Sequence, residues 1–151
     1  MKGGTRVPGS MALEMFVLLS VISLIGIVAI PSYNSYRTNS SANCVANKFR
    51  TYAASFHHYA DLHGEWPGEQ IPGEIPEGMT GKLPDFQKAT VIGGIWDWET
   101  SRDSTPAAIC LLEPGGTEEL ILRIDQILDD GDLASGNLVY RGDRLILSLL
   151  K

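Results

Sequence analysis

The longest run of apolar positions lies near the amino terminus, at residues 10–30. It has 21 residues, and Glu14 is its only charged member. A helix rises 1.5 Å per residue, so about 20 apolar residues cross a hydrocarbon core of about 30 Å, whereas a secretory signal has an apolar region of about 7–15 residues. The run therefore predicts a transmembrane helix. Lys2 and Arg6 before it, with Tyr33 and Tyr36 after it, favour a cytoplasmic amino terminus and place the rest of the chain on the other side.

A helical period of apolar positions follows the run. Residues 33–63 contain no proline or glycine, and apolar side chains recur there at spacings of four, three, four and three: Val45, Phe49, Tyr52, Phe56 and Tyr59. This pattern predicts that residues 31–63 form an amphipathic helix, which continues the membrane helix on the same axis and ends at Gly64. Pro31 removes one backbone donor and predicts a kink or a loosened turn. We expect the polar face to lie in water in a monomer: Arg37, Asn39, Asn43, Asn47, Lys48 and Arg50.

Residues 65–90 have neither period. Four prolines and four glycines punctuate them, which predicts a long loop. Loops of this length are uncommon in compact domains unless they are functional or wrap a surface. We expect its scattered apolar residues to hold it on the domain: Trp66, Ile71, Ile75, Met79, Leu83 and Phe86.

The period changes to two at residues 91–99, which predicts a strand with Trp96 and Trp98 on one face. We expect both rings to pack on the apolar stripe of the long helix, with Gly94 permitting close approach and Asp97 and Glu99 on the other face. Further elements are expected as a strand at 106–112, a helix at 118–130 capped by Thr117 and ended by Gly131, and a hairpin of strands 138–140 and 145–147. The predicted fold class is α+β, a long amino-terminal helix packed on a small antiparallel sheet.

Length, net charge and cysteine count limit the number of domains and the kinds of ligand that the chain can bind. The chain has 151 residues, room for about one domain, and a net charge of −6 from 12 basic and 18 acidic residues. No segment gathers the basic residues that phosphate binding requires, so we expect no nucleic-acid partner. Cys44 and Cys110 exclude a cysteine-only zinc site and allow one disulfide or two separate thiols.

Two sets of side chains are candidates for metal binding. Asp129, Asp130 and Asp132 follow the second predicted helix, where a cation would relieve their repulsion with the helix dipole. They form either a Ca²⁺ site or a solvated acidic cap. The three histidines, His57, His58 and His63, lack the i, i+3 or i, i+4 spacing of chelating pairs, and we expect no metal there. No nucleophile motif or spaced carboxylate pair is present, so we expect no enzyme and no other cofactor.

Glu14 is the anomaly of the apolar run. A carboxylate at the centre of a membrane helix costs about 2.5–3.5 kcal/mol on insertion scales, and less near an end. It either stays wet at the cytoplasmic interface or is met by a cation. Cleavage after Gly9 would create an α-amino group at Ser10, one helical turn from Glu14 or within reach of the same carboxylate on a neighbouring copy.

These residues resemble the amino termini of bacterial type IV prepilins and of the pseudopilins of type II secretion. Gly9 ends a short basic leader, Glu14 is the fifth residue after it, Pro31 is the twenty-second, and Ser32-Tyr33 follows as in that family. The chain departs from the pattern in having Ser10 as the first residue, where the family has a large apolar one, and Pro8 before the cleavage glycine. Three later segments, at 75–79, 92–99 and 128–136, are more loosely similar to a group of pilin-like proteins with this type of head.

The resemblance implies an organisation and a function. Residues 1–9 are the leader removed by prepilin peptidase, Ser10 is the N-methylated residue, 10–30 the transmembrane helix, 31–63 its amphipathic continuation, and 64–151 a globular head. The protein is then a single-pass inner-membrane subunit with a periplasmic head. An inner-membrane platform assembles it, through Glu14, with copies of itself or other pilin-like subunits into a type IV pilus or a secretion pseudopilus. The alternative is a membrane-anchored periplasmic binding protein that never polymerises.

Overall fold

The computed structural model describes residues 8–100 and 106–149. The chain divides into two units, residues 1–37 and 38–151. The order of the elements is α1 (Pro8–His63), β1 (Ile95–Glu99), β2 (Ala107–Leu112), α2 (Glu118–Leu128), β3 (Leu138–Arg141) and β4 (Arg144–Leu149). The predicted α+β class is confirmed.

The described part of the first unit is helical throughout. Helix α1 runs through Pro31 without a break in its helical assignment, and a kink there stays a prediction. Three serine hydroxyls in this part, those of Ser20, Ser23 and Ser32, donate to carbonyl oxygens four residues earlier at 2.7–2.9 Å. Because the helix satisfies these hydroxyls itself, they need no water.

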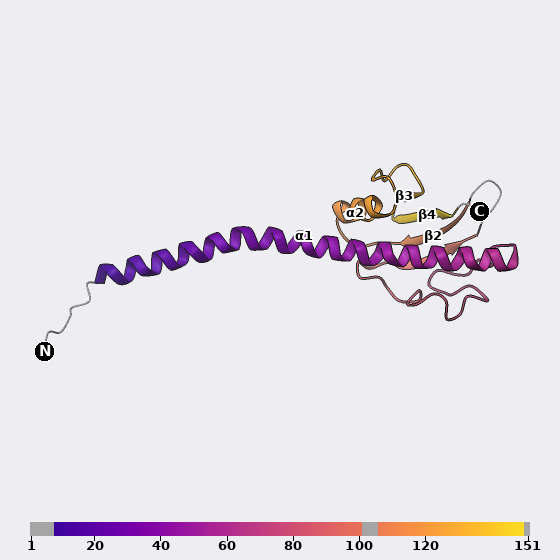
Figure 1. Ribbon diagram of the computed structural model, residues 1–151, viewed down its shortest axis with the longest axis horizontal. Helices are drawn as coiled ribbons and strands as arrows, with labels where there is room; N and C mark the ends of the chain where they lie inside the picture. Colours follow the sequence, from indigo (N-terminus) through magenta and orange to yellow (C-terminus); the bar gives the residue numbers. More distant parts are fainter. Residues whose placement is uncertain (1–7, 101–105, 150–151) are drawn as a thin grey trace. The chain divides into compact units, whose positions relative to one another are not determined.

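In the second unit, α1 lies along a four-stranded antiparallel sheet of order β1-β2-β4-β3 (Figure 1). Both tryptophans of β1 are buried against α1, as predicted. The Trp96 ring meets Phe49 edge-on with centroids 4.8 Å apart, and Trp98 stacks on Phe56 at 3.8 Å. The sheet, α1, α2 and the long loop thus share one core.

Strand β1 is shorter than predicted. It begins at Ile95 because residues 90–94 form a turn, in which Gly93 donates to the Thr90 carbonyl at 3.0 Å and both glycines have positive φ. Gly94 does permit a close approach, but to β2 and not to α1, since a Cβ there would lie 2.6 Å from the Leu112 carbonyl oxygen. Asp97 lies on the face opposite the two tryptophans, as expected, but it is buried there, with only 7% of its surface exposed.

Helix α2 starts as predicted and ends early. The Leu120 amide donates to the Thr117 hydroxyl at 3.3 Å, which is the expected N-cap. The helix ends at Leu128 instead of residue 130, because Asp129 leaves the helical conformation and its carboxylate accepts hydrogen bonds from the Asn137 and Leu138 amides. Gly131, with φ +83°, lies beyond this end.

The two cysteines are free, so the alternative of two separate thiols holds and the disulfide is wrong. The strand register gives the reason. Cys110 is paired with Asp97, so it lies on the sheet face opposite the one on which Trp96 and Trp98 meet α1. Cys44 belongs to α1, and the sheet separates the two thiols. Burial, then the nearby Glu99 and Asp97 carboxylates, raise the pKa of the Cys110 thiol.

The long loop between α1 and β1 is held on the domain, as its apolar residues predicted. Met79, Leu83 and Phe86 are buried, and Trp66 and Ile75 are partly buried against the core. Ile71 is the exception, with 66% of its surface exposed at a turn.

Polar side chains of α1 complete the attachment of the loop. Lys48 forms an ion pair with Asp85 at 3.1 Å, the Tyr52 hydroxyl donates to the Pro84 carbonyl at 2.6 Å, and Ser55 donates to the Lys82 carbonyl at 3.1 Å. The expectation that the polar face lies in water is therefore wrong for Lys48. It is also wrong for Asn39, which is partly buried and accepts a hydrogen bond from Arg123 at 2.9 Å. Arg50 is exposed, as expected, although it donates to the Ile127 carbonyl at 2.6 Å.

Candidate functional site

The first candidate site is the apolar segment of α1, residues 11–30. Its large apolar side chains are exposed by between 48% for Val21 and 70% for Phe16. A continuous apolar surface of this size is typical of a segment that is covered by lipid or by other helices. By length and composition the helix could cross a membrane.

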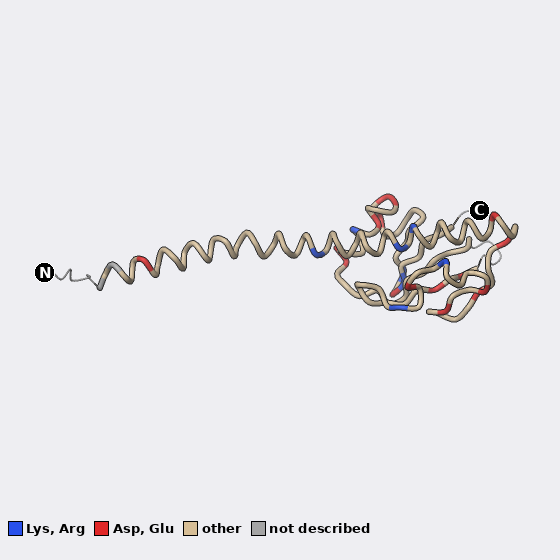
Figure 2. Tube along the Cα trace, turned by 60° about the horizontal axis from the view of Figure 1, so that its bottom comes forward, with Lys and Arg blue, Asp and Glu red and all other residues tan. Residues whose placement is uncertain are grey.

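Glu14 is the only acidic residue of this part of α1 (Figure 2). Gly9 and Ser10 lie in the first turn of the helix, so Ser10 and Glu14 have the i, i+4 spacing of neighbouring turns. At Gly9 and at Gly26 an added Cβ would meet no other atom within 4 Å. The leader residues 1–7 lie outside the described residues. Cleavage after Gly9 and methylation of Ser10 stay predictions.

The second candidate is the acidic loop, defined here as residues 125–138, from the last turn of α2 to the start of β3. Carboxylate oxygens of Asp125, Asp129 and Asp130 lie within 4.8 Å of one another. Two of the three predicted ligands are therefore together. Asp132 is outside this group, and its oxygens accept hydrogen bonds from the Ala134 amide at 3.0 Å and the Ser135 hydroxyl at 3.1 Å.

Asp125 was missed because it falls within the apolar stripe of α2, between Ile124 and Ile127. The signal that could have found it is its i, i+4 spacing to Asp129, which puts both carboxylates on one face. The side chain is fully buried, and neither of its oxygens has a hydrogen-bond partner of good geometry. Burial first, then the Asp130 charge, raise the pKa of this carboxyl, and the Gly131 amide opposes the shift. The last turn of α2 contains no basic residue.

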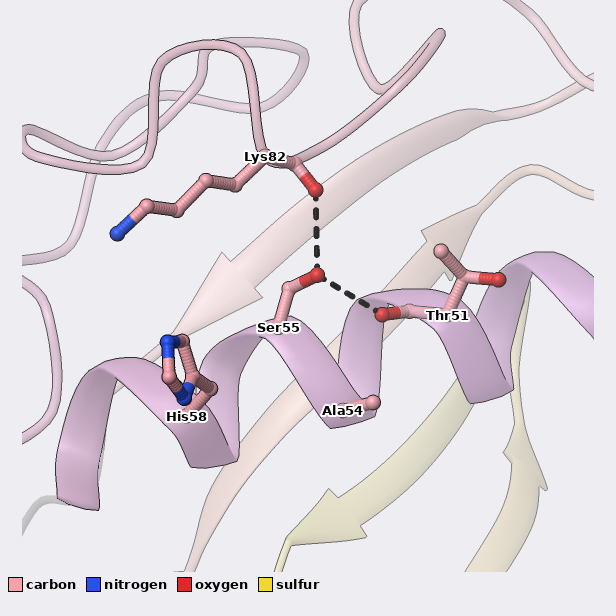
Figure 3. A pocket seen from close by; sticks show the side chains of 5 residues that line it. All are labelled: Thr51, Ala54, Ser55, His58 and Lys82. Atoms are coloured by element: carbon pink, nitrogen blue, oxygen red, sulfur yellow. Dashed lines mark hydrogen bonds between the residues drawn. The ribbon is translucent and has the colours of Figure 1, made fainter.

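The third candidate is an open groove of about 650 Å³ beside α1, lined by Thr51, Ala54, Ser55, His58 and Lys82 (Figure 3). The Ser55 hydroxyl shares its proton between the Thr51 carbonyl at 3.0 Å and the Lys82 carbonyl at 3.1 Å. The Lys82 ammonium lies 5.9 Å from the centroid of the Tyr59 ring. These contacts attach the long loop to α1, so Ser55 and Lys82 have a structural role in this groove.

Two of the three histidines, His57 and His63, contact aromatic rings. His57 lies 5.4 Å from Trp66 and His63 lies 4.2 Å from Tyr59, measured between ring centroids. In the part of the chain that the structure describes, the only group of three or more metal-ligating side chains is that of Asp125, Asp129 and Asp130.

Comparisons with protein-family models, with curated proteins and with solved structures give no match to this chain.

Proposed function

We propose that the chain is a structural subunit of a pilin-like filament, a type IV pilus or a type II secretion pseudopilus. The observation that carries the proposal is the exposed apolar segment of α1 with one carboxylate, Glu14, at the fifth position after Gly9. A lipid bilayer covers this segment before assembly, and neighbouring helices cover it afterwards.

The assembly mechanism follows from the charge. Prepilin peptidase removes residues 1–9 and leaves a cationic α-amino group on Ser10, which is then methylated. In the filament the carboxylate of Glu14 neutralises the terminal amine of a neighbouring subunit, so neither charge stays unpaired among apolar helices. The inner-membrane platform adds subunits one at a time, and each carries its folded head to the filament surface.

The core of the second unit supports separate roles for the apolar segment of α1, in assembly, and for the folded head. Among the described residues, the buried apolar side chains of the core lie between Ala42 and Leu149, and none comes from residues 11–30. Their apolar surface is therefore available for lipid and for other subunits.

Processing is tested by the intact mass of the chain made in cells that contain prepilin peptidase. We expect the mature chain to begin at Ser10, and Gly9→Val to stay at full length because the side chain blocks the cleavage position. Gly4→Val, in the same leader, is the matched control and should be cut. A wild-type chain that begins at Met1, while a prepilin in the same cells is cut, would contradict the proposal and favour a membrane-anchored binding protein that never polymerises.

A further inference from the structure

We infer that the open groove between α1 and Lys82 receives the acidic loop of a second copy of this chain. The inference rests on the proposed filament function, because it names a contact between the heads of neighbouring subunits. It adds a head-to-head interface to the packing of the apolar segments.

The groove is a basic feature of an acidic protein. Its lining includes Lys82 and His58 and contains no acidic residue. Lys82 carries a positive charge, and the imidazole of His58 has an N–H donor in either charge state. Both residues are exposed, and within the described part of the chain neither forms an ion pair. The groove therefore offers two free donors to a negatively charged ligand.

The acidic loop has the complementary charge. Asp130 and Asp132 are exposed, and no basic side chain among the described residues forms an ion pair with either carboxylate. The loop itself orients them. Asp130 accepts from the Asp132 amide at 2.9 Å, and the Ser135 hydroxyl lies 3.1 Å from oxygens of both carboxylates. A loop that is already ordered loses little conformational entropy when it binds.

A second copy is the occupant because one copy cannot fill its own groove. In the second unit the long loop that forms one wall of the groove lies on one side of α1, and the acidic loop lies on the other side (Figure 1). Each copy would use its groove toward one neighbour and its acidic loop toward the next. A contact of this heterologous kind extends into an open filament when the rotation between copies does not close a ring.

The net charge of the chain gives this contact a purpose. The chain carries a charge of −6, so neighbouring heads repel one another unless groups of opposite sign meet. Exposed ion pairs contribute little on their own. Packing of the apolar segments holds two heads at a high effective concentration, at which a weak contact is occupied. The contact then fixes the register of neighbouring heads, while the helices supply most of the affinity.

The test replaces Ala54, an exposed residue of the groove, by the photo-crosslinking amino acid p-benzoylphenylalanine. The full chain is made in cells that contain prepilin peptidase and assemble filaments, and crosslinked peptides are identified by mass spectrometry. We expect a dimer in which residue 54 of one copy is joined to residues 129–137 of another. The same probe at Glu74, an exposed residue of the long loop, is the control and should not give this product.

Charge reversal separates recognition from folding. Lys82→Glu and Asp132→Lys should each lower the yield of the crosslink several-fold, because each brings like charges together. The double variant of Lys82→Glu with Asp132→Lys restores opposite signs and should recover the crosslink. Arg141→Glu, an exposed change on the β3–β4 hairpin, is the matched control and should leave the yield unchanged.

The outcomes distinguish this inference from the proposed function. If the chain is incorporated into filaments but the probe at residue 54 misses the acidic loop, or the double variant shows no recovery, the inference is overturned and the filament proposal stands. If the intact mass shows a chain that still begins at Met1, the proposed function fails, and the inference fails with it.

Discussion

At the scale of single residues, the two tryptophans of β1 share a face but differ in their hydrogen bonding. The Trp98 indole donates to the Pro67 carbonyl at 3.0 Å, whereas the Trp96 indole nitrogen is buried without a partner. Both rings fill the core, so we expect Trp→Ala at either position to cost about 3–5 kcal/mol. Trp→Phe keeps an aromatic ring at each position and removes the indole N–H, so it separates the effect of the hydrogen-bond donor on stability from the effect of ring packing.

We predict that Trp98→Phe destabilises the fold more than Trp96→Phe does, by about 1 kcal/mol. The first change leaves a carbonyl without its donor, while the second removes a donor that had no partner. Urea unfolding of the full chain in detergent, followed by circular dichroism, measures the difference. Equal costs, or a larger cost for Trp96→Phe, would show that packing alone decides stability at both sites.

The buried carboxyl group of Asp97 should make the stability of the fold depend on pH. Burial raises its pKa above the usual range, while the Trp98 amide at 2.9 Å and Arg144 oppose the shift and Glu99 and Glu69 add to it. Because the folded state prefers the protonated acid, the contribution of Asp97 to stability is most favourable below its unfolded pKa of about 3.9 and is lost as the pH rises through the raised folded pKa.

We therefore expect Asp97→Asn to be more stable than the wild type at pH 7, and the difference to shrink as the pH falls toward about 4. The amide oxygen of asparagine can still accept the Trp98 hydrogen bond, so the change removes only the charge. Denaturant unfolding of the variant and the wild type at pH 7 and at about pH 4 measures this difference, with Asp61→Asn, a change at an exposed acidic position of α1, as the control. A variant that is less stable than the wild type at pH 7 would mean that Arg144 outweighs burial.

At the scale of elements, three side chains on one face of α1 attach the long loop: Lys48, Tyr52 and Ser55. The ion pair of Lys48 and Asp85 is partly exposed and contributes little. The hydrogen bond from Tyr52 to the Pro84 carbonyl is partly buried, and burial of the phenol, followed by the Asp85 charge, raises the pKa of Tyr52 to about 12. Tyr52 is the strongest of the three attachments.

We predict that Tyr52→Phe costs about 0.5–1.5 kcal/mol, since it removes one hydrogen bond and keeps the ring. The loop should also be cut faster by protease at residues 79–88, because its attachment there is weakened. Tyr36→Phe is the matched control, since Tyr36 is exposed on the same helix. Unchanged stability together with unchanged cleavage would show that the buried Met79, Leu83 and Phe86 hold the loop without help.

The elements that the sequence predicted best are those with a long, regular period. The stripe from Val45 to Tyr59 and the alternation of Trp96 and Trp98 specify which faces are buried, because each face repeats several times. The start of β1 was missed because alternation continues through Gly93 and Gly94, whose positive φ values turn the chain. The disulfide could not be decided from the sequence, since the face on which Cys110 lies depends on the strand register.

The partly predicted acidic site has a similar explanation. Asp129 and Asp130 were predicted because they are adjacent acidic residues at a helix end, a local pattern that the sequence shows directly. Asp125 lies next to isoleucines in the sequence, and its burial depends on how α2 packs. The hydrogen-bond partners of Asn39 and Arg50 were missed because they lie 84 and 77 residues away in the sequence. Pairings over such separations have no local signal.

At the scale of the whole molecule, the two units show opposite patterns of apolar residues. From residue 42 onward, apolar side chains from helix, loop and sheet form a closed core. In residues 11–30 the apolar side chains are exposed all around the helix. A helix that is apolar on every side cannot bury all of its surface against a single soluble domain. Lipid or other helices must therefore contact it.

The last prediction concerns Glu14, the one charge that these surroundings must accommodate. Glu14→Gln keeps the size of the side chain and removes its charge, so the subunit should be inserted and cleaved normally but should enter filaments with wild-type neighbours several-fold less often. Glu14→Val removes the insertion cost of about 2.5–3.5 kcal/mol and should be anchored at least as well, yet should share the assembly defect. Ser20→Ala, a neutral change in the same segment, is the control and should assemble normally. Subunit content in sheared filaments, with crosslinking to neighbouring subunits, measures incorporation. If both Glu14 variants were incorporated like the control, the carboxylate would be a hydrated interfacial residue, and filament assembly would have to rest on the packing of apolar helices alone.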